Sequence, residues 1–118
     1  MRVAIKMRNQ NEEIFIFSQK MLKTKKWEQS NLLNKTNDIG VMLLLIIISA
    51  NHENKAINLK TLCQSVKFSQ RSVSYSIKNL ISLGWVELVA DPKDKRRQLI
   101  KTTHLFMSLF LQYIDQLD

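Results

Sequence analysis

The chain of 118 residues contains one cysteine, one proline and two glycines. A single cysteine excludes an internal disulfide, which fits a reducing compartment. The basic first ten residues contain no apolar h-region, so a signal peptide is not expected. The most hydrophobic stretch, "VMLLLIIIS", has about half of the roughly 20 residues that a membrane-spanning helix needs. We therefore expect a cytoplasmic protein with no membrane segment.

Patterns that would indicate catalysis or metal binding are also missing. The sequence has no evident nucleophile–base pair, no glycine-rich phosphate loop and no paired acids. His52 and His104 have no cysteine or carboxylate at metal-ligand spacing. The sequence therefore predicts a protein that is not an enzyme and needs no metal or other cofactor.

Acidic residues are scarce relative to basic ones. The chain has 10 Asp and Glu against 18 Lys and Arg, which gives a formal net charge of +8. Such an excess favours a polyanionic partner or an acidic membrane surface. The apolar share of 45% is ordinary for a globular protein. This length allows one domain with a modest core, and many chains of this size gain stability by oligomerising.

Two helices are predicted in the first half of the chain. From Asn11 to about Trp27, apolar residues recur at helical spacing. A second helix begins after one of three possible capping residues, Thr36, Asn37 or Asp38, and runs to about Asn51. Because Ile39 to Ile48 contain hardly a polar atom, we expect this helix to be buried nearly all round.

The second half of the chain has more residues that signal the ends of helices and strands. Ala56–Ile57 is read as a very short strand, and Asn58 and Ser69 as the caps of two further helices. Gly84 supplies the residue tolerant of positive φ at which the second of these should end. Residues 85–90 and 98–102 are strand-like, with a charged loop between them. Thr103 can cap a last helix.

The order helix, short turn, helix, hairpin is a helix-turn-helix followed by a wing. The predicted fold is therefore mostly α, a winged helix-turn-helix of order α-α-β-α-α-β-β-α with outer helices at both ends. Between Lys55 and Lys101 there are ten basic residues and three acidic ones. Positive charge thus gathers where a phosphate backbone would lie.

The stretch from Asn58 to Thr103, about two fifths of the chain, resembles the winged-helix core of the MarR family of bacterial transcription regulators. "LCQSVKFSQRSVSYSIKNLISLGWVE" follows the family's helix-turn-helix register, and "DPKDKRRQLIKTT" resembles its wing. By this match Asp94 and Arg96 take the Asp and Arg positions of the wing. Lys67 departs from the glycine that is frequent in the turn. The brief C-terminal region is similar to the small, lysine-rich SarA-type branch.

The resemblance implies that the wing lies over the DNA backbone and places an arginine in the minor groove, with Asp94 holding Arg96 extended. Gln70 and Arg71 are the candidates for contacts to base edges, although Arg71 could equally contact phosphate. The alternative for the wing is a solvated hairpin tip. The full predicted DNA-binding set is Ser69, Gln70, Arg71, Ser72, Ser74, Tyr75, Lys78, Lys93, Asp94, Lys95, Arg96 and Arg97.

The last helix is apolar on more than one face, so a monomer would leave one such face in water. Together with the first helix this predicts a two-fold homodimer. We expect one domain over 1–118, with dimerisation and core helices at about 11–50 and 103–118, and the helix-turn-helix and wing at 55–102. Cys63 is read as a small buried hydrophobe in preference to a redox sensor. The predicted dimerisation residues are Ile14, Phe17, Met21, Phe106, Phe110, Tyr113 and Leu117.

The predicted function is a sequence-specific regulator of transcription that binds double-stranded DNA as a homodimer, a repressor at a palindromic site. One alternative is a winged-helix adaptor or anti-regulator that binds proteins, because fold alone does not decide function. Another is a DNA-binding factor of plasmid or phage replication or transfer. Whether a small-molecule effector is sensed stays open.

Overall fold

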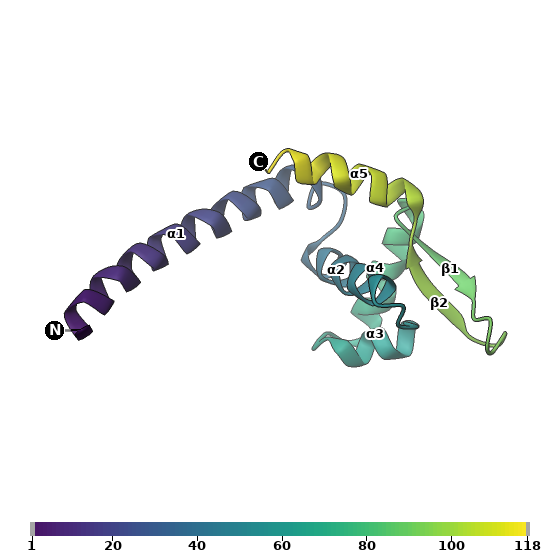
Figure 1. Cartoon of the computed structure of the whole chain (residues 1–118). Coiled ribbons are helices and arrows are strands. Elements are labelled where there is room, and N and C mark those ends of the chain that lie inside the picture. Colours follow the sequence, from purple (N-terminus) through teal and green to yellow (C-terminus); the bar gives the residue numbers. More distant parts are fainter. Residues whose placement is uncertain (1, 118) are drawn as a thin grey trace.

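A computed structural model describes the backbone of residues 2–117 and the side chains of residues 9–117. Over this range the chain forms five helices and one two-stranded sheet (Figure 1). The winged-helix architecture predicted from the sequence is confirmed. The elements are α1 (Arg2–Asn31), α2 (Asp38–His52), α3 (Leu59–Ser65), α4 (Gln70–Ser82), β1 (Val86–Ala90), β2 (Gln98–Thr102) and α5 (His104–Asp115).

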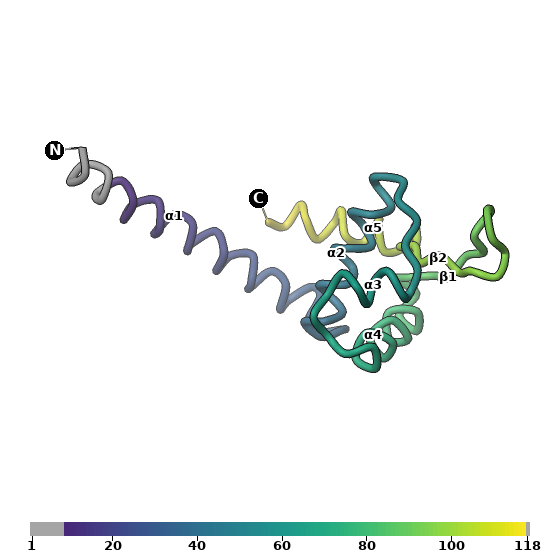
Figure 2. The backbone as a smooth tube through the Cα atoms, turned by 90° about the horizontal axis from the view of Figure 1, so that it is seen from below, coloured from purple at the N-terminus to yellow at the C-terminus, as the bar shows by residue number. Residues whose placement is uncertain are grey.

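Helix α1 is longer at both ends than the Asn11–Trp27 predicted. It extends from Arg2 to Asn31 because no proline or glycine interrupts this stretch. Most of the helix projects from the rest of the fold, which gives the molecule extents of 63 × 28 × 26 Å (Figures 1 and 2). Its C-terminal end is anchored by Leu32, which is buried in the core.

Helix α2 begins at the second of its three possible caps. The Oδ1 atom of Asn37 accepts a hydrogen bond of 2.8 Å from the backbone N–H of Gly40. The prediction of burial nearly all round was wrong, because Met42 and Leu45 are each 47% exposed. The sequence is uniformly apolar, but neighbouring elements cover only one side of this helix.

The start and end of α4 follow from local sequence signals. Ser69 caps it by accepting a hydrogen bond of 3.1 Å from Ser72 N–H. At its other end Gly84 has a φ of +75°, as predicted. The N–H groups of Gly84 and Trp85 donate to the carbonyls of Ile81 and Leu80. These bonds form a Schellman motif, which turns the chain directly into the wing.

The wing is an antiparallel pair in which Val86 lies opposite Thr102. The short strand predicted at Ala56–Ile57 is not formed within the described residues. Instead, a single hydrogen bond of 2.8 Å joins Ile100 N–H to the Ile57 carbonyl. Asn58 follows at once and caps α3 through a reciprocal capping box with Thr61, which leaves no length for a strand.

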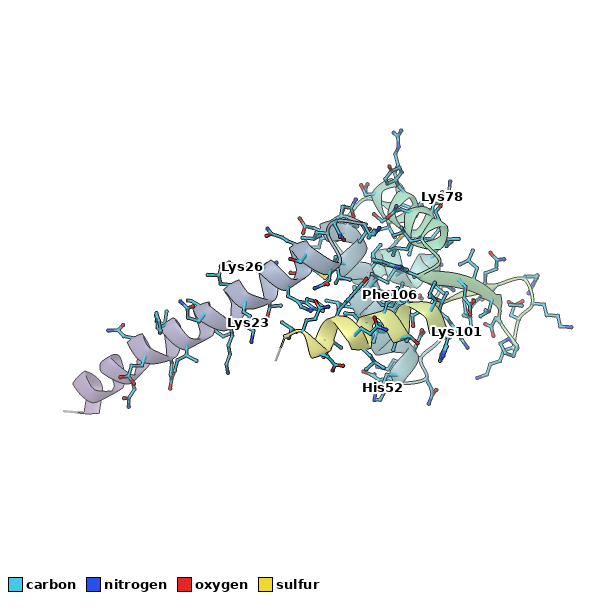
Figure 3. All side chains as sticks on the ribbon, turned by 90° about the horizontal axis from the view of Figure 1, so that it is seen from above. Lys23, Lys26, His52, Lys78, Lys101 and Phe106 are labelled. Carbon is cyan, nitrogen blue, oxygen red and sulfur yellow. The ribbon has the colours of Figure 1, made fainter. Side chains whose placement is uncertain are left out.

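The core lies where α2, α4, the wing and the start of α5 meet. Thr103 caps α5, as predicted, by accepting a hydrogen bond of 3.1 Å from Phe106 N–H. Its hydroxyl also donates to the Gly84 carbonyl at 2.6 Å. Phe106 is fully buried (Figure 3). At the far end of α5, the Trp27 indole N–H donates to the Tyr113 carbonyl, so α5 also fastens α1 to the fold.

Candidate nucleic-acid interface

Helix α4 turns a polar, acid-free face to solvent. Its inner side buries Val73, Ile77 and Leu80. The side chains predicted to contact DNA are exposed, or in two cases (Ser72 and Ser74) half-buried, and the helix contains no Asp or Glu. Lys78 is among these exposed side chains (Figure 3). The members of this face are Ser69, Gln70, Arg71, Ser72, Ser74, Tyr75 and Lys78.

The charged loop between β1 and β2 is folded by its own backbone. Asp91 is buried, and its Oδ1 accepts a hydrogen bond of 2.8 Å from Lys93 N–H. The Asp91 carbonyl accepts from Asp94 N–H at 3.2 Å, and the Asp94 carbonyl accepts from Arg97 N–H at 2.9 Å. The loop thus consists of linked tight turns, and its five consecutive charged residues have fixed backbone positions.

Asp94 is the centre of the wing tip. Its Oδ1 accepts hydrogen bonds from both the backbone N–H and the Nε of Arg96, at 3.1 and 3.2 Å. Its Oδ2 lies 3.8 Å from Nε of Arg97. The Arg96 side chain is nevertheless 92% exposed. The carboxylate therefore binds the Nε atom of Arg96 and leaves the two terminal nitrogens of the guanidinium available to an anion.

The wing tip and α3 border a common groove of about 430 Å³. Lys60 lines it from α3, and Lys95, Arg96 and Arg97 line it from the loop. Positive charge from separate parts of the sequence thus converges on one surface, as the charge distribution predicted. Such a basic groove suits the phosphates of a nucleic acid.

Besides Arg96 and Arg97, which pair with Asp94, one more of the ten basic residues in this region forms an ion pair among the described residues. Lys55 lies 2.7 Å from Glu53. Their hydrogen bond, reinforced by charge attraction, raises the pKa of Lys55 and lowers the pKa of Glu53. Both side chains are exposed, so the pair contributes little to stability. It does reduce the attraction of Lys55 for an anion.

The residues predicted for dimerisation lie in different environments. Ile14 and Phe17 are 63% and 62% exposed, and Met21 is also exposed. Phe106, in contrast, is completely buried within the subunit, so it cannot lie at an interface. Phe110, Tyr113 and Leu117 are half-buried. Other large apolar side chains of α1 and α5 are also exposed but were not predicted for dimerisation. They are Phe15, Ile16, Leu22, Leu105, Met107, Leu111 and Ile114.

The remaining candidates have no special surroundings. Cys63 is half-buried and packs against the core, which agrees with a packing role. His52 and His104 are exposed. Among the described residues, no three His, Cys, Asp or Glu side chains gather as metal ligands would. Within the same range no helix is both long and apolar enough to cross a bilayer.

Beside α4 lies a second hollow, of about 250 Å³, that the sequence analysis did not find. Arg71, Ser72 and Tyr75 line it from α4 and were already predicted to bind DNA. Asn37, Ile39 and Ser76 also line it and were not predicted. The cap at Asn37 was recognisable in the sequence, but its position beside α4 depends on the tertiary fold.

Comparisons with known proteins agree with this architecture. No curated protein matches the chain significantly in sequence. A mutant of S. aureus MepR bound to an oligodeoxyribonucleotide has a similar fold, with a TM-score of 0.67 and 14% identity over 88% of this chain and 74% of that one. Wild-type apo MarR from E. coli has a TM-score of 0.62 and 18% identity, over 87% of this chain and 71% of that one. Mutant E. coli MarR complexed with operator DNA has a TM-score of 0.58 and 22% identity, over 87% of this chain and 74% of that one.

The TM-scores establish a shared fold at low sequence identity, and the MarR-type architecture suggested by the sequence is confirmed at that level. A family model described as "Winged helix DNA-binding domain" matches residues 40–104. The match covers more than half of the chain and includes α3, α4 and both strands of the wing. This chain is therefore a member of the winged-helix DNA-binding domain family.

Proposed function

We propose that the protein is a transcription regulator that binds double-stranded DNA through α4 and the wing. The observation that carries this proposal is the pairing of an acid-free, solvent-facing α4 with a wing whose Arg96 is held by Asp94 and projects into solvent. The similar solved structures include MepR and MarR bound to DNA, which supports the same use here. We propose that the protein acts as a repressor in the cytoplasm. We assign no catalytic activity to it.

In this proposal the polar residues of the interface have separate tasks. Gln70 and Arg71 open α4. Gln70 reads a base edge in the major groove, and Arg71 contacts either a base edge or the phosphate backbone there. Arg96 enters the minor groove, and Asp94 orients it. Contacts to the phosphate backbone fix the register without reading sequence. The residues assigned to the backbone are Ser69, Ser72, Ser74, Tyr75, Lys78, Lys93, Lys95 and Arg97.

The protein acts as a homodimer built from α1 and α5. Large apolar side chains are exposed on both α1 and the outer side of α5, and grouped exposed apolar side chains are typical of protein–protein interfaces. A two-fold dimer would cover this surface and present two copies of α4 to a palindromic site. The dimer contacts assigned are Ile14, Phe17, Met21, Phe110, Tyr113 and Leu117, without the buried Phe106.

Selection of bound fragments from random duplex DNA by the purified protein tests this function. We expect enrichment of a palindrome whose half-sites lie about 10 base pairs apart between centres. Affinity should fall steeply with salt, because two subunits would neutralise on the order of 6–10 phosphates. Failure to enrich any sequence, with affinity that stays flat from low to moderate salt, would instead favour a protein-binding adaptor.

A further inference from the structure

The hollow between the start of α2 and the outer side of α4 has the features of an anion site. It encloses about 250 Å³ and is lined by two groups of residues from distant parts of the sequence. Asn37 and Ile39 come from the N-terminal end of α2. Arg71, Tyr75 and Ser76 come from α4, together with Ser72. We name this hollow the α2–α4 niche.

The N-terminal end of α2 supplies hydrogen-bond donors to the niche. In a helix the first N–H groups have no carbonyl partner within the helix, and the helix dipole makes this end positive. Asn37 satisfies the N–H of Gly40. The N–H groups of Asp38 and Ile39 precede it in the same first turn and have no helical partner. A fifteen-residue helix is long enough for its dipole to favour an anion here.

Ser76 provides an independent sign of a missing ligand. Its residue is 1% exposed, and its Oγ has no hydrogen-bond partner among the described residues. Leaving a buried hydroxyl unpaired is unfavourable, so such groups are rare in folded proteins. Ser76 is also one of the residues that line the niche. An acceptor bound in the niche would satisfy this hydroxyl.

Contacts between the two helices hold the niche in shape. The Thr36 hydroxyl, just before α2, donates a hydrogen bond of 2.8 Å to Oδ1 of Asn79 on α4. Gly40 allows Thr36 to lie against α2, because a Cβ at this position would fall 2.1 Å from the Thr36 Oγ1. The N-terminal end of α2 therefore has a fixed position relative to Arg71 and Ser76.

The charges around the niche favour an anion but include one opposing group. Arg71 lines the niche and is exposed, and α4 has no acidic residue. Asp38 occupies the first turn of α2 and is exposed. Its carboxylate would repel a bound anion, although solvent and salt screen it. The backbone donors, the guanidinium and the unpaired hydroxyl together outnumber this single acid.

We propose that the α2–α4 niche binds a phosphate group, held by the N-terminal end of α2, Arg71 and the Ser76 hydroxyl. The inference rests on the proposed function in one respect: the phosphate belongs to the DNA backbone beside the major groove that α4 enters. Free inorganic phosphate has the same chemistry and is the other possible source. The niche would then fix the height and angle of α4 on the duplex, which base contacts alone do not set.

Ser76→Ala, tested with the full-length protein, removes the hydroxyl and leaves the helix intact. Alanine favours helix and leaves no unpaired buried group, so the variant should unfold at the same temperature as wild type or higher. We expect about tenfold weaker binding to the selected duplex, since a hydrogen bond to a charged group is lost. Equal affinity of the variant and wild type for the duplex would rule out the DNA backbone as the source of the phosphate.

Neutral methylphosphonate linkages placed at single positions of that duplex locate the contact. For wild type, one linkage per half-site should weaken binding more than its neighbours. For Ser76→Ala, the loss at that same linkage should shrink, because part of the interaction is already gone. If all linkages respond alike in both proteins, DNA binding stands but the niche does not hold a backbone phosphate. If neither protein binds any duplex, the proposed function itself has failed.

Titration of ¹⁵N-labelled protein with inorganic phosphate, against chloride at equal ionic strength, separates the two sources. Saturable shifts of the Asp38 and Ile39 amide signals that Ser76→Ala abolishes would show a phosphate site in the free protein. If these shifts occur but every methylphosphonate linkage weakens duplex binding alike, the niche binds free phosphate. If neither the shifts nor a linkage-specific loss of affinity is observed, the proposal is overturned.

Asp38→Asn tests the same site by a gain of affinity. It removes the opposing charge and should tighten binding by about two- to fivefold, as expected for one charge near a helix end. Asp115→Asn, at the end of α5 and not among the residues that line the niche, changes the net charge equally and serves as the control. Equal gains from both variants would mean a non-specific charge effect and would count against the niche.

Discussion

The rings of Trp85 and Phe106 lie 5.0 Å apart, and Phe106 also stacks on Phe110 at 5.3 Å. Phe110 in turn contacts Trp27, with ring centroids separated by 5.9 Å. This aromatic series connects the start of the wing, α5 and the end of α1. It shows that α5 belongs to the subunit core along one side, whatever partner covers its other side.

Phe106→Ala should destabilise the subunit by about 3–5 kcal/mol, because it leaves a cavity in a fully buried site. Urea unfolding at a fixed protein concentration measures this change. Leu88→Ala, at a half-exposed position on β1, is the control and should cost far less. Similar losses for both variants would contradict the placement of Phe106 in the core.

Phe17→Ser should weaken the dimer without unfolding the chain, because Phe17 is exposed and packs on no core residue of its own subunit. The dissociation constant of the dimer should rise by about tenfold or more, since each subunit loses an aromatic ring that dimerisation would bury. Sedimentation equilibrium measures it. Leu88→Ser removes an exposed apolar side chain outside the proposed interface and should leave the dimer intact. A wild-type protein that sediments as a monomer would refute the interface altogether.

Gly40→Ala should destabilise the protein by about 1–3 kcal/mol, although alanine is normally the better helix residue. The added Cβ would lie 2.1 Å from the Thr36 Oγ1, so Thr36 must move and lose its bond to Asn79. Thermal unfolding checks this effect. If the clash is the cause, Gly40→Ala combined with Thr36→Ala should cost less than the sum of the two single changes. Strict additivity would disprove this explanation.

The sequence predicted best those features that local chemistry determines. Asn58, Ser69 and Thr103 cap helices because their side chains can reach N–H groups in the first turn. Gly84 ends α4 because the chain there needs positive φ. These signals depend on residues within a few positions of one another, so no tertiary information was needed.

Features that depend on distant neighbours were predicted less well. Uniformly apolar segments such as α2 and α5 do not reveal which of their sides faces the core, so Met42 was expected to be buried and Phe106 was assigned to the dimer interface. The α2–α4 niche brings Asn37 beside Ser76, and no local pattern indicates that proximity. The predicted α1 is too short at both ends because amphipathic periodicity marks only the part of a helix that has an apolar face, whereas the helix continues as long as no proline or glycine interrupts it.

Arg96→Ala should weaken DNA binding by about 1–3 kcal/mol while leaving the fold unchanged, because the side chain is 92% exposed and supports no core contact. The loss should be greater on duplexes with A·T-rich flanks, where a narrow minor groove concentrates negative potential. Titration against duplexes that differ only in their flanks measures both effects. Arg97→Ala removes the same charge from the same loop. Because Arg97 is assigned to the phosphate backbone of the DNA, this change should weaken binding equally on duplexes with either kind of flank.

Asp94→Ala distinguishes two roles for the acid at the wing tip. If its Oδ1 orients Arg96 through the bonds at 3.1 and 3.2 Å, removing it should copy the Arg96 effect in weaker form, with the same dependence on the flanks. If the carboxylate mainly repels phosphate, its removal should tighten binding to every duplex alike. The first outcome is expected, because a guanidinium already held near its bound position loses less conformational freedom on binding. Tighter binding by Asp94→Ala would contradict the proposed role of Asp94.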